Sequence, residues 1–292
     1  MSFIGVILAV VALFSWGFGD FFIQKSARSL GTWQALFLIC LFGAIFTFPF
    51  VISELGYLNL WSVLILLLLS VVLTFAALFD FEALKQGKLA VIEPLMGLEL
   101  PLTVALGAVL IGEKLTVIQA LLILVVFLGI VMAATVHHTY LFYHRRLLEK
   151  GVIFAGLGAI TMALSNFLTG VGSRKTSAFM SMWFVDVFLM LVCLVYLIYR
   201  RELKDCFVKL SRNTKVVLGQ CFFDNIAWVA YAWSMVLIPI GVATAISESY
   251  IVLTVMLGIF VNHERLKNHQ ILGAVMAAIG VISLSLITAT GY

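Results

Sequence analysis

The chain has 292 residues, of which 63% are hydrophobic and only 11% are charged, and its mean hydropathy is +1.17. A soluble core of this length cannot bury so much apolar surface, so water is excluded as the main solvent of the folded protein. The net charge is +4, with the basic residues confined to particular loops, and nucleic acid is therefore not an expected partner. The four cysteines have no Cys-x-x-Cys spacing, which argues against a disulfide framework or a zinc site.

Ten apolar stretches reach about 20 residues, the length that an α-helix needs to cross a hydrocarbon core of about 30 Å. They cover 3–24, 32–52, 60–81, 90–111 and 117–136 in the first half, and 151–169, 178–199, 216–237, 241–261 and 271–288 in the second. The first stretch lacks a basic leader and a small-residue cleavage pattern, so we expect a retained helix instead of a signal peptide. The sequence predicts an all-α integral membrane protein with ten transmembrane helices.

The basic residues indicate an orientation in the membrane. Fifteen of the 18 lysines and arginines fall in loops that leave odd-numbered spans, and the opposite face has only Lys114, Arg174 and Lys175. Short cytoplasmic loops carry the excess of positive charge in membrane proteins. Because ten is an even number, both termini share a face, and we predict that they lie on the non-cytoplasmic side of the cytoplasmic (inner) membrane.

The two halves of the chain repeat one another at an offset of 151 positions, the separation of Glu113 and Glu264. The matches at this offset are Gly112-Glu113-Lys114-Leu115 with His263-Glu264-Arg265-Leu266, Leu102-Thr103-Val104 with Leu253-Thr254-Val255, Gly107 with Gly258, Gln119 with Gln270, and Gly129 with Gly280. We expect a first repeat at 1–139, a linker at 140–150 and a second repeat at 151–292. Five helices are an odd number, so the repeats enter the membrane in opposite senses, as in inverted-repeat transporters.

These features resemble the ten-helix EamA-type branch of the drug/metabolite transporter superfamily, and the resemblance covers the whole chain. It depends on the repeat, on the pair Trp16-Gly17, and on the turn that ends in Glu113 to Leu115, which recurs around Glu264. It implies secondary transport, often export, of amino acids, nucleotide sugars, choline-like amines or other metabolites through a central cavity between the halves. Many members of that family are associated with cytoplasmic termini, whereas the loop charges here favour the reverse.

Acidic residues inside the spans are the strongest functional signal. Eight of the 14 acids lie in the spans or at their ends: Asp20, Asp80, Glu82, Glu93, Glu99, Asp186, Asp224 and Glu248. A carboxylate near the bilayer centre persists only when it is paired, protonated or facing a wet cavity. Since no lysine or arginine sits comparably deep, the interior favours protons, metal ions or cationic substrates over anions.

Three predicted helices place a tryptophan one helical turn from an acid. The pairs are Trp16 with Asp20, Trp183 with Asp186, and Trp228 with Asp224, and Tyr231 follows Trp228 on the same face. Aromatic ring faces and a carboxylate together attract a desolvated ammonium group, so we predict that these residues bind an amine. The alternative is that the tryptophans form interfacial belts and the acids cap helix ends. For Trp16 and Asp20 the two interpretations are equal, whereas Asp186 and Asp224 lie farther from span ends and favour the cavity.

Glu99 and Glu248 lie in the fourth and ninth spans, which are equivalent helices of the two halves. An acid in an apolar interior holds a proton until a cation approaches, so we predict that both couple transport to protons. Glu99 and Tyr250 are also expected to line the substrate site. The alternative is a protonated acid in a fixed hydrogen bond between helices.

No nucleophile elbow, phosphate-binding loop or metallohydrolase spacing occurs, so we predict no enzymatic activity, no cofactor and no metal site. The sequence predicts a secondary active transporter that moves a small cationic or amine-bearing metabolite by alternating access, with proton coupling. The alternatives are a transporter of neutral or zwitterionic metabolites, such as amino acids or sugar conjugates, and a divalent-cation channel or carrier. The expected partners are the small-molecule substrate, protons and membrane lipids, with the chain as a monomer or homodimer.

Overall fold

The computed structural model describes residues 2–86, 95–134, 150–253 and 267–290, and these ranges are helical without any strand. In the first half the helices are α1 (Ser2–Leu30), α2 (Thr32–Val51), α3 (Leu60–Gln86), α5 (Glu99–Leu110) and α6 (Val117–Ala134), with a 3-10 turn, η1, at Leu55–Tyr57. In the second half they are α7 (Lys150–Lys175), α8 (Ala178–Tyr199), α9 (Leu203–Arg212), α10 (Thr214–Leu237), α11 (Ile240–Ser247) and α13 (Asn268–Thr290). The prediction of an all-α membrane protein is confirmed.

The helices follow the apolar stretches of the sequence closely. Six of those that the structure describes are long and apolar enough to cross a membrane, namely α1, α2, α3, α7, α8 and α13. The fourth, fifth and ninth spans contain shorter apolar helices, and α10 carries the charged Lys215 and Asp224 within an otherwise apolar run. The main departure is α9, an amphipathic helix in what the sequence indicated only as a loop.

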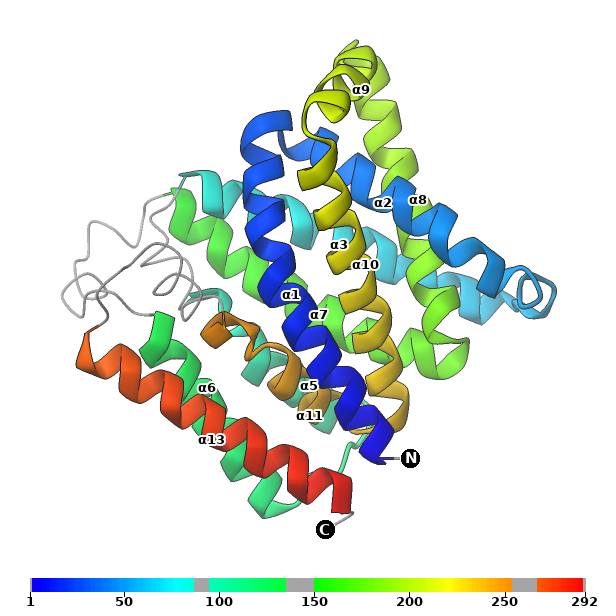
Figure 1. Cartoon of the computed structure of the whole chain (residues 1–292). Helices are drawn as coiled ribbons and strands as arrows, with labels where there is room; N and C mark the ends of the chain where they lie inside the picture. Colours follow the sequence, from blue (N-terminus) through cyan, green and yellow to red (C-terminus); the bar gives the residue numbers. More distant parts are fainter. Residues whose placement is uncertain (1, 87–94, 135–149, 254–266, 291–292) are drawn as a thin grey trace.

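The helix pairing is that of two repeats related by an approximate two-fold axis. Figure 1 shows two of the pairs, α1 beside α10 and α6 beside α13. Helix α1 packs along α10. In the repeat, α1 corresponds to α7 and α10 corresponds to α3, and α7 likewise packs along α3. The remaining large contacts join equivalent helices of the two halves, α2 with α8 and α6 with α13. Each half therefore completes its packing against the other half, and the two repeats are inverted with respect to one another.

Helices α6 and α13 show the antiparallel contact in detail. Glycines let the two backbones meet, because a side chain built on Gly129 would lie 2.6 Å from the backbone nitrogen of Ala277. At the two ends of this helix pair, Nε2 of Gln119 donates to Oγ1 of Thr288 at 3.3 Å, and Nε2 of Gln270 donates to the carbonyl of Ala133 at 3.2 Å. The matching positions of the repeat thus make matching bonds across the interface.

The fourth and ninth spans share a break in the helix at the repeat offset. Residues 97–98 and 248–249 form turns, and each turn is spanned by a hydrogen bond between residues three apart. The amide of Leu100 donates to the carbonyl of Gly97 at 3.4 Å, and the amide of Ile251 donates to the carbonyl of Glu248 at 3.3 Å. Broken helices at corresponding positions expose backbone and side chains at the interface of inverted repeats. Glu99 is the first residue after the first break, and Glu248 is the first residue of the second break.

The turn between α5 and α6 is tied to the second half through Glu113. Its carboxylate accepts hydrogen bonds from the amides of Ile240 at 2.9 Å and Gly241 at 3.4 Å, which are the first residues of α11. Arg174, at the end of α7, pairs with the same carboxylate at 2.7 Å and donates to the carbonyls of Met235 and Ile238. We name these contacts the Glu113 clasp, and they join three helices of the second half to one turn of the first.

The two chain ends lie close together, and α9 lies at the opposite end of the molecule (Figure 1). The hydroxyl of Ser2 is 3.4 Å from the carbonyl of Ala289, which fixes the ends of α1 and α13 beside one another. An even number of spans requires both ends to share a face.

Candidate substrate and proton sites

Four aromatic rings from α1, α10 and the segment after α11 meet in the interior, and we call them the aromatic cluster. The indole of Trp16 contacts Trp228 at 5.2 Å and Tyr231 at 5.1 Å, measured between ring centroids, and both contacts are edge-to-face. Tyr250 approaches the same indole at 5.9 Å. The cluster forms because Trp228 and Tyr231 share one face of α10, which packs along α1.

Tyr231 is fully buried and its hydroxyl is held in a defined direction. It lies 2.8 Å from Oγ1 of Thr244, which itself donates to the carbonyl of Ile240 at 2.8 Å. Because the single hydroxyl proton of Thr244 is used in that bond, the phenol of Tyr231 is the donor to Thr244. This hydrogen bond holds the ring of Tyr231 where it contacts Trp16.

Glu99 and Glu248 meet at the side of this cluster. Each is 6% exposed, the two side chains share a hydrogen bond, and both interact electrostatically with the phenol of Tyr231. Two carboxyl groups can share a hydrogen bond only when at least one carries a proton, because a carboxylate has no hydrogen to donate. This hydrogen bond joins equivalent spans of the two halves.

Asp186 and Asp224 lie together at a second place, where α2, α8 and α10 cross. Both are half-buried, and they interact with one another electrostatically. A side chain built on Gly43 of α2 would coincide with Oδ2 of Asp186 and Oδ1 of Asn225. We call Gly43, Asp186 and Asn225 the α8–α10 carboxyl site, and Asp224 links it along α10 to Trp228, one helical turn away.

Trp183 lies apart from the aromatic cluster. Its ring contacts Phe48 at 6.1 Å and packs in a separate apolar group with Val51, Leu66 and Met180. The structure thus brings Trp16, Trp228, Tyr231 and Tyr250 together and leaves Trp183 in the separate group beside Phe48. The side chain of Asp20 lies outside the part that the structure describes, and only its backbone in α1 is placed.

The sequence reasoning missed a row of uncharged polar side chains on α7. Asn166, Thr169 and Ser173 follow one another at helical spacing, each is at most 2% exposed, and a polar atom of each has no hydrogen-bond partner among the described residues. Their spacing was the available signal. Sequence reasoning also missed Asn225, whose position beside Asp224 gives no indication of its contact with α2.

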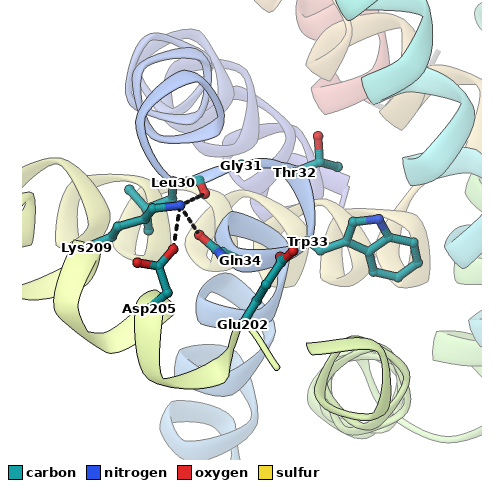
Figure 2. A pocket seen from close by; sticks show the side chains of 8 residues that line it. All are labelled: Leu30, Gly31, Thr32, Trp33, Gln34, Glu202, Asp205 and Lys209. Carbon is teal, nitrogen blue, oxygen red and sulfur yellow. Dashed lines mark hydrogen bonds and ion pairs between the residues drawn. The ribbon is translucent and has the colours of Figure 1, made fainter. Parts of the chain in front are cut away.

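A small cavity of about 230 Å³ lies near α9, and the ion pair of Asp205 and Lys209 forms part of its lining (Figure 2). Nζ of Lys209 donates to the carbonyl of Leu30 at 3.1 Å, to Oε1 of Gln34 at 3.1 Å and to the carboxylate of Asp205 at 2.8 Å. The hydrogen bond from Lys209 holds the pKa of Asp205 below its usual value. These contacts anchor α9 to the turn between α1 and α2, and we assign them a structural role.

No curated protein matches the chain. Among solved structures 29 chains match. One of these crystal structures has a TM-score of 0.75 and 14% sequence identity, and the match covers 97% of each chain.

The match with a protein-family model decides the family. The model of the EamA-like transporter family matches residues 3–135 and again residues 149–286, so each half of the chain carries one copy. The chain therefore belongs to the EamA-like transporter family and is a membrane transporter of the drug/metabolite transporter superfamily.

Proposed function

We propose that the protein carries a small cationic or amine-bearing metabolite across the cytoplasmic membrane by alternating access, in exchange for protons. The observation that supports this most directly is the aromatic cluster beside the paired carboxyls of Glu99 and Glu248. Both elements of an ammonium site, ring faces and negative charge, come from different helices and converge in the interior.

The geometry of the rings supports a cationic ligand. In an edge-to-face contact the positive edge of one ring rests on the negative face of the other. The indole of Trp16 makes two such contacts, with Trp228 and Tyr231. An ammonium group satisfies the same ring faces when the rings separate, so the closed cluster is a suitable resting arrangement for an amine site.

The paired carboxyls supply the exchange. A cation that enters beside Glu99 and Glu248 lowers the cost of a second negative charge, and the shared proton then leaves. Conversely, a proton that returns to the pair restores the hydrogen bond and releases the cation. One site thus alternates between two kinds of positive charge, which is the requirement for antiport.

The repeat provides the movement. The half-bundles are inverted, their broken helices meet at the site, and rocking of one half against the other exposes such a site to each side in turn. The loop charges further support an orientation with both termini outside the cytoplasm. A fluorescent reporter that matures only in the cytoplasm, fused after Tyr292, is expected to stay dark, and a bright fusion would reverse the orientation.

Transport in proteoliposomes tests the proposal with the purified full chain. We expect saturable, counterflow-capable uptake of radiolabelled choline or ethanolamine, driven by a proton gradient. Replacement Trp16→Ala is expected to weaken amine affinity at least about tenfold, since a desolvated cation–π contact contributes about 2 kcal/mol. Trp183→Ala is the matched control, because that ring lies outside the aromatic cluster.

Two results would count against this function. Uptake that does not respond to pH, or that is unaltered by Glu248→Gln, would remove the proton exchange. Large unitary currents in a planar bilayer would indicate a channel instead of a carrier.

A neutral or zwitterionic substrate is the second candidate, and the polar row on α7 favours it. Asn166, Thr169 and Ser173 offer uncharged hydrogen-bonding groups that are buried and without partners among the described residues. Thermal-shift screening distinguishes the candidates. Stabilisation by amino acids or sugar conjugates that is lost in Thr169→Val would favour the neutral substrate, whereas stabilisation by amines that is lost in Trp16→Ala favours the cation.

A further inference from the structure

The α8–α10 carboxyl site contains an acceptor that faces another acceptor. Both hydrogens of the Asn225 amide are used, because Nδ2 donates to the carbonyl of Ile39 at 3.2 Å and to that of Cys221 at 2.8 Å. These two partners are acceptors only, so they determine which end of the amide is nitrogen. The oxygen Oδ1 is therefore the end that remains for Asp186. Asn225 is 4% exposed, so this orientation is held in the interior.

The carboxyl of Asp186 is directed at the same place. A methyl group on Gly43 would clash with Oδ1 of Asn225 and with Oδ2 of Asp186, so both oxygens border the space above this glycine. The carboxyl carbon of Asp186 lies 2.7 Å from that methyl position. Among the residues that the structure describes, none donates a hydrogen bond to either oxygen. Two acceptors in such proximity repel one another unless a positive charge or a hydrogen lies between them.

The surroundings add negative charge and no positive charge. The titratable groups that face Asp186 are Asp224 and Cys221 on α10 and Cys40 on α2, and Cys193 of α8 faces Cys40. The sequences of α2 and α8 contain no lysine or arginine, and α10 has only Lys215 in its first turn. An ionised Asp186 at mid-span would thus face Asn225 and Asp224 without compensation.

The chemistry of the site favours a proton over a metal ion. Hard cations need several oxygen ligands, whereas the neighbours here are one amide oxygen, two carboxyls and two thiols, those of Cys40 and Cys221. In the described ranges no group of three His, Cys, Asp or Glu side chains is arranged to hold a metal. A proton needs only one donor oxygen and one acceptor, and the pair of Asp186 and Asn225 supplies both.

We propose that Asp186 is a proton-binding site, in which the carboxyl takes a proton from water and donates the resulting O–H to Oδ1 of Asn225 in the space above Gly43. The site is separate from Glu99 and Glu248, and its half-buried position leaves it accessible to protons. Release of the proton leaves two unshielded acceptors and forces the crossing of α2, α8 and α10 to adjust. Since Asp224 and Trp228 are on the same helix, that adjustment reaches the aromatic cluster.

Infrared difference spectroscopy of the purified protein in lipid tests the site without any substrate. The C=O stretch of a neutral carboxylic acid is absent from carboxylates, and we record its loss between mildly acidic and alkaline buffer. One such band is expected to disappear in Asp186→Asn, which mimics the protonated form because its amide nitrogen can donate to Asn225. The same band is expected to persist in Asp224→Asn and Glu248→Gln, which leave the pair intact.

Exchanging the two residues tests the hydrogen bond between them more directly. In the double substitution D186N/N225D the carboxyl and the amide swap helices, and we expect an acid band to return. In Asn225→Leu the carboxyl of Asp186 remains but loses its acceptor, so its band is expected to move to higher frequency. These variants keep the test decisive if Asp186→Asn alone fails to fold.

Two outcomes would overturn the proposal. Identical bands in the wild type and Asp186→Asn would show that Asp186 holds no proton. Loss of the band on addition of sodium chloride at constant pH would show that a metal cation occupies the site instead.

The role of this proton in transport rests on the proposed function, and a separate measurement tests it. In proteoliposomes choline uptake by Asp186→Asn is expected to respond less steeply to the proton gradient than uptake by the wild type, because Glu99 and Glu248 still exchange a proton and only the proton of Asp186 is lost. If no amine is transported by the wild type, the proposed function fails and the infrared result still stands. If amine transport in Asp186→Asn stays fully coupled, the site binds a proton that transport does not use, and its role in coupling is wrong.

Discussion

Gly43 shows how much one absent side chain determines in this protein. Its position on α2 is filled by the oxygens of Asp186 and Asn225, so three helices meet where no Cβ exists. The sequence could not reveal this, because Gly43 and Asn225 are in different halves and neither belongs to a motif. It did locate Asp186 and Asp224 as interior acids, since charge in an apolar span is visible without any structure.

Replacement Gly43→Ala is expected to destabilise the protein by about 1 to 3 kcal/mol, because the new methyl group displaces both oxygens in a packed crossing. Thermal unfolding of the purified protein measures the effect. Gly56→Ala is the control, since a Cβ at that position would meet no atom within 4 Å. Equal unfolding temperatures for the two variants would contradict the close approach of α2 to α8 and α10.

The aromatic residues mark the limit of pattern reasoning at this scale. Helical spacing correctly put Trp228 and Tyr231 on one face of α10, because that relation is local. It could not determine how far each helix is rotated about its axis, and Trp183 consequently lies with Phe48, away from Trp16. Contacts between helices depend on packing, which a one-dimensional pattern does not contain.

Among the elements, the apolar spans were predictable and their interruptions were not. The bounds of α8 agree with the predicted stretch because the run from Ala178 to Tyr199 is apolar with a single charged residue, Asp186. The break at 248–249 lies in a run that is apolar on both sides, so a hydropathy profile gives one continuous span and does not reveal the break. Similarly, α9 is too short and too charged to be detected by length and composition.

The Glu113 clasp gives a test of how a turn stabilises a neighbouring helix. Glu113→Ala removes an acceptor from two amides of α11 and from Arg174, and bonds to charged groups contribute about 1.5 to 3 kcal/mol each. We expect a clear fall in unfolding temperature. The adjacent Lys114→Ala is the control, because Lys114 is exposed. A variant of Glu113 as stable as that of Lys114 would show that the clasp is unimportant.

The anchor of α9 gives a pH dependence. The pKa of Asp205 is lowered by the hydrogen bond from Lys209, so its contribution is present above the ordinary aspartate pKa and is lost as pH falls through the lowered value. The protection of the α9 amides, taken relative to the intrinsic exchange rate at each pH, is therefore expected to fall on acidification, and Lys209→Met should give the same fall at neutral pH. Lys204→Met is the control because Lys204 is exposed. No difference between these two variants would contradict the anchor.

For the whole molecule, the sequence repeat was sufficient to predict the architecture. An offset of 151 positions with an odd number of spans per half requires inversion, and the pairing of α6 with α13 confirms it. The repeat succeeded where local patterns failed because it is a property of the whole chain. It could not show which contacts make the interface between the halves.

The two-fold relation predicts that equivalent substitutions act equally. Gln119 and Gln270 are buried, and each bonds both its own helix start and the partner helix. Gln119→Leu and Gln270→Leu should each lower stability by about 1 to 2 kcal/mol, and their effects should add because they lie at opposite ends of the pair. Chemical unfolding in detergent measures this. A large effect from only one of them would show that the interface is asymmetric.

The proximity of Ser2 to Ala289 has a consequence for how the chain can be rearranged. The end of α13 could be joined to the start of α1 by a short peptide, and new ends could then be opened in the linker between the halves. Such a circular permutant would be synthesised with the second five helices first, while each half would keep its sense across the bilayer. The order in which the halves leave the ribosome would thus be separable from the bundle that they form.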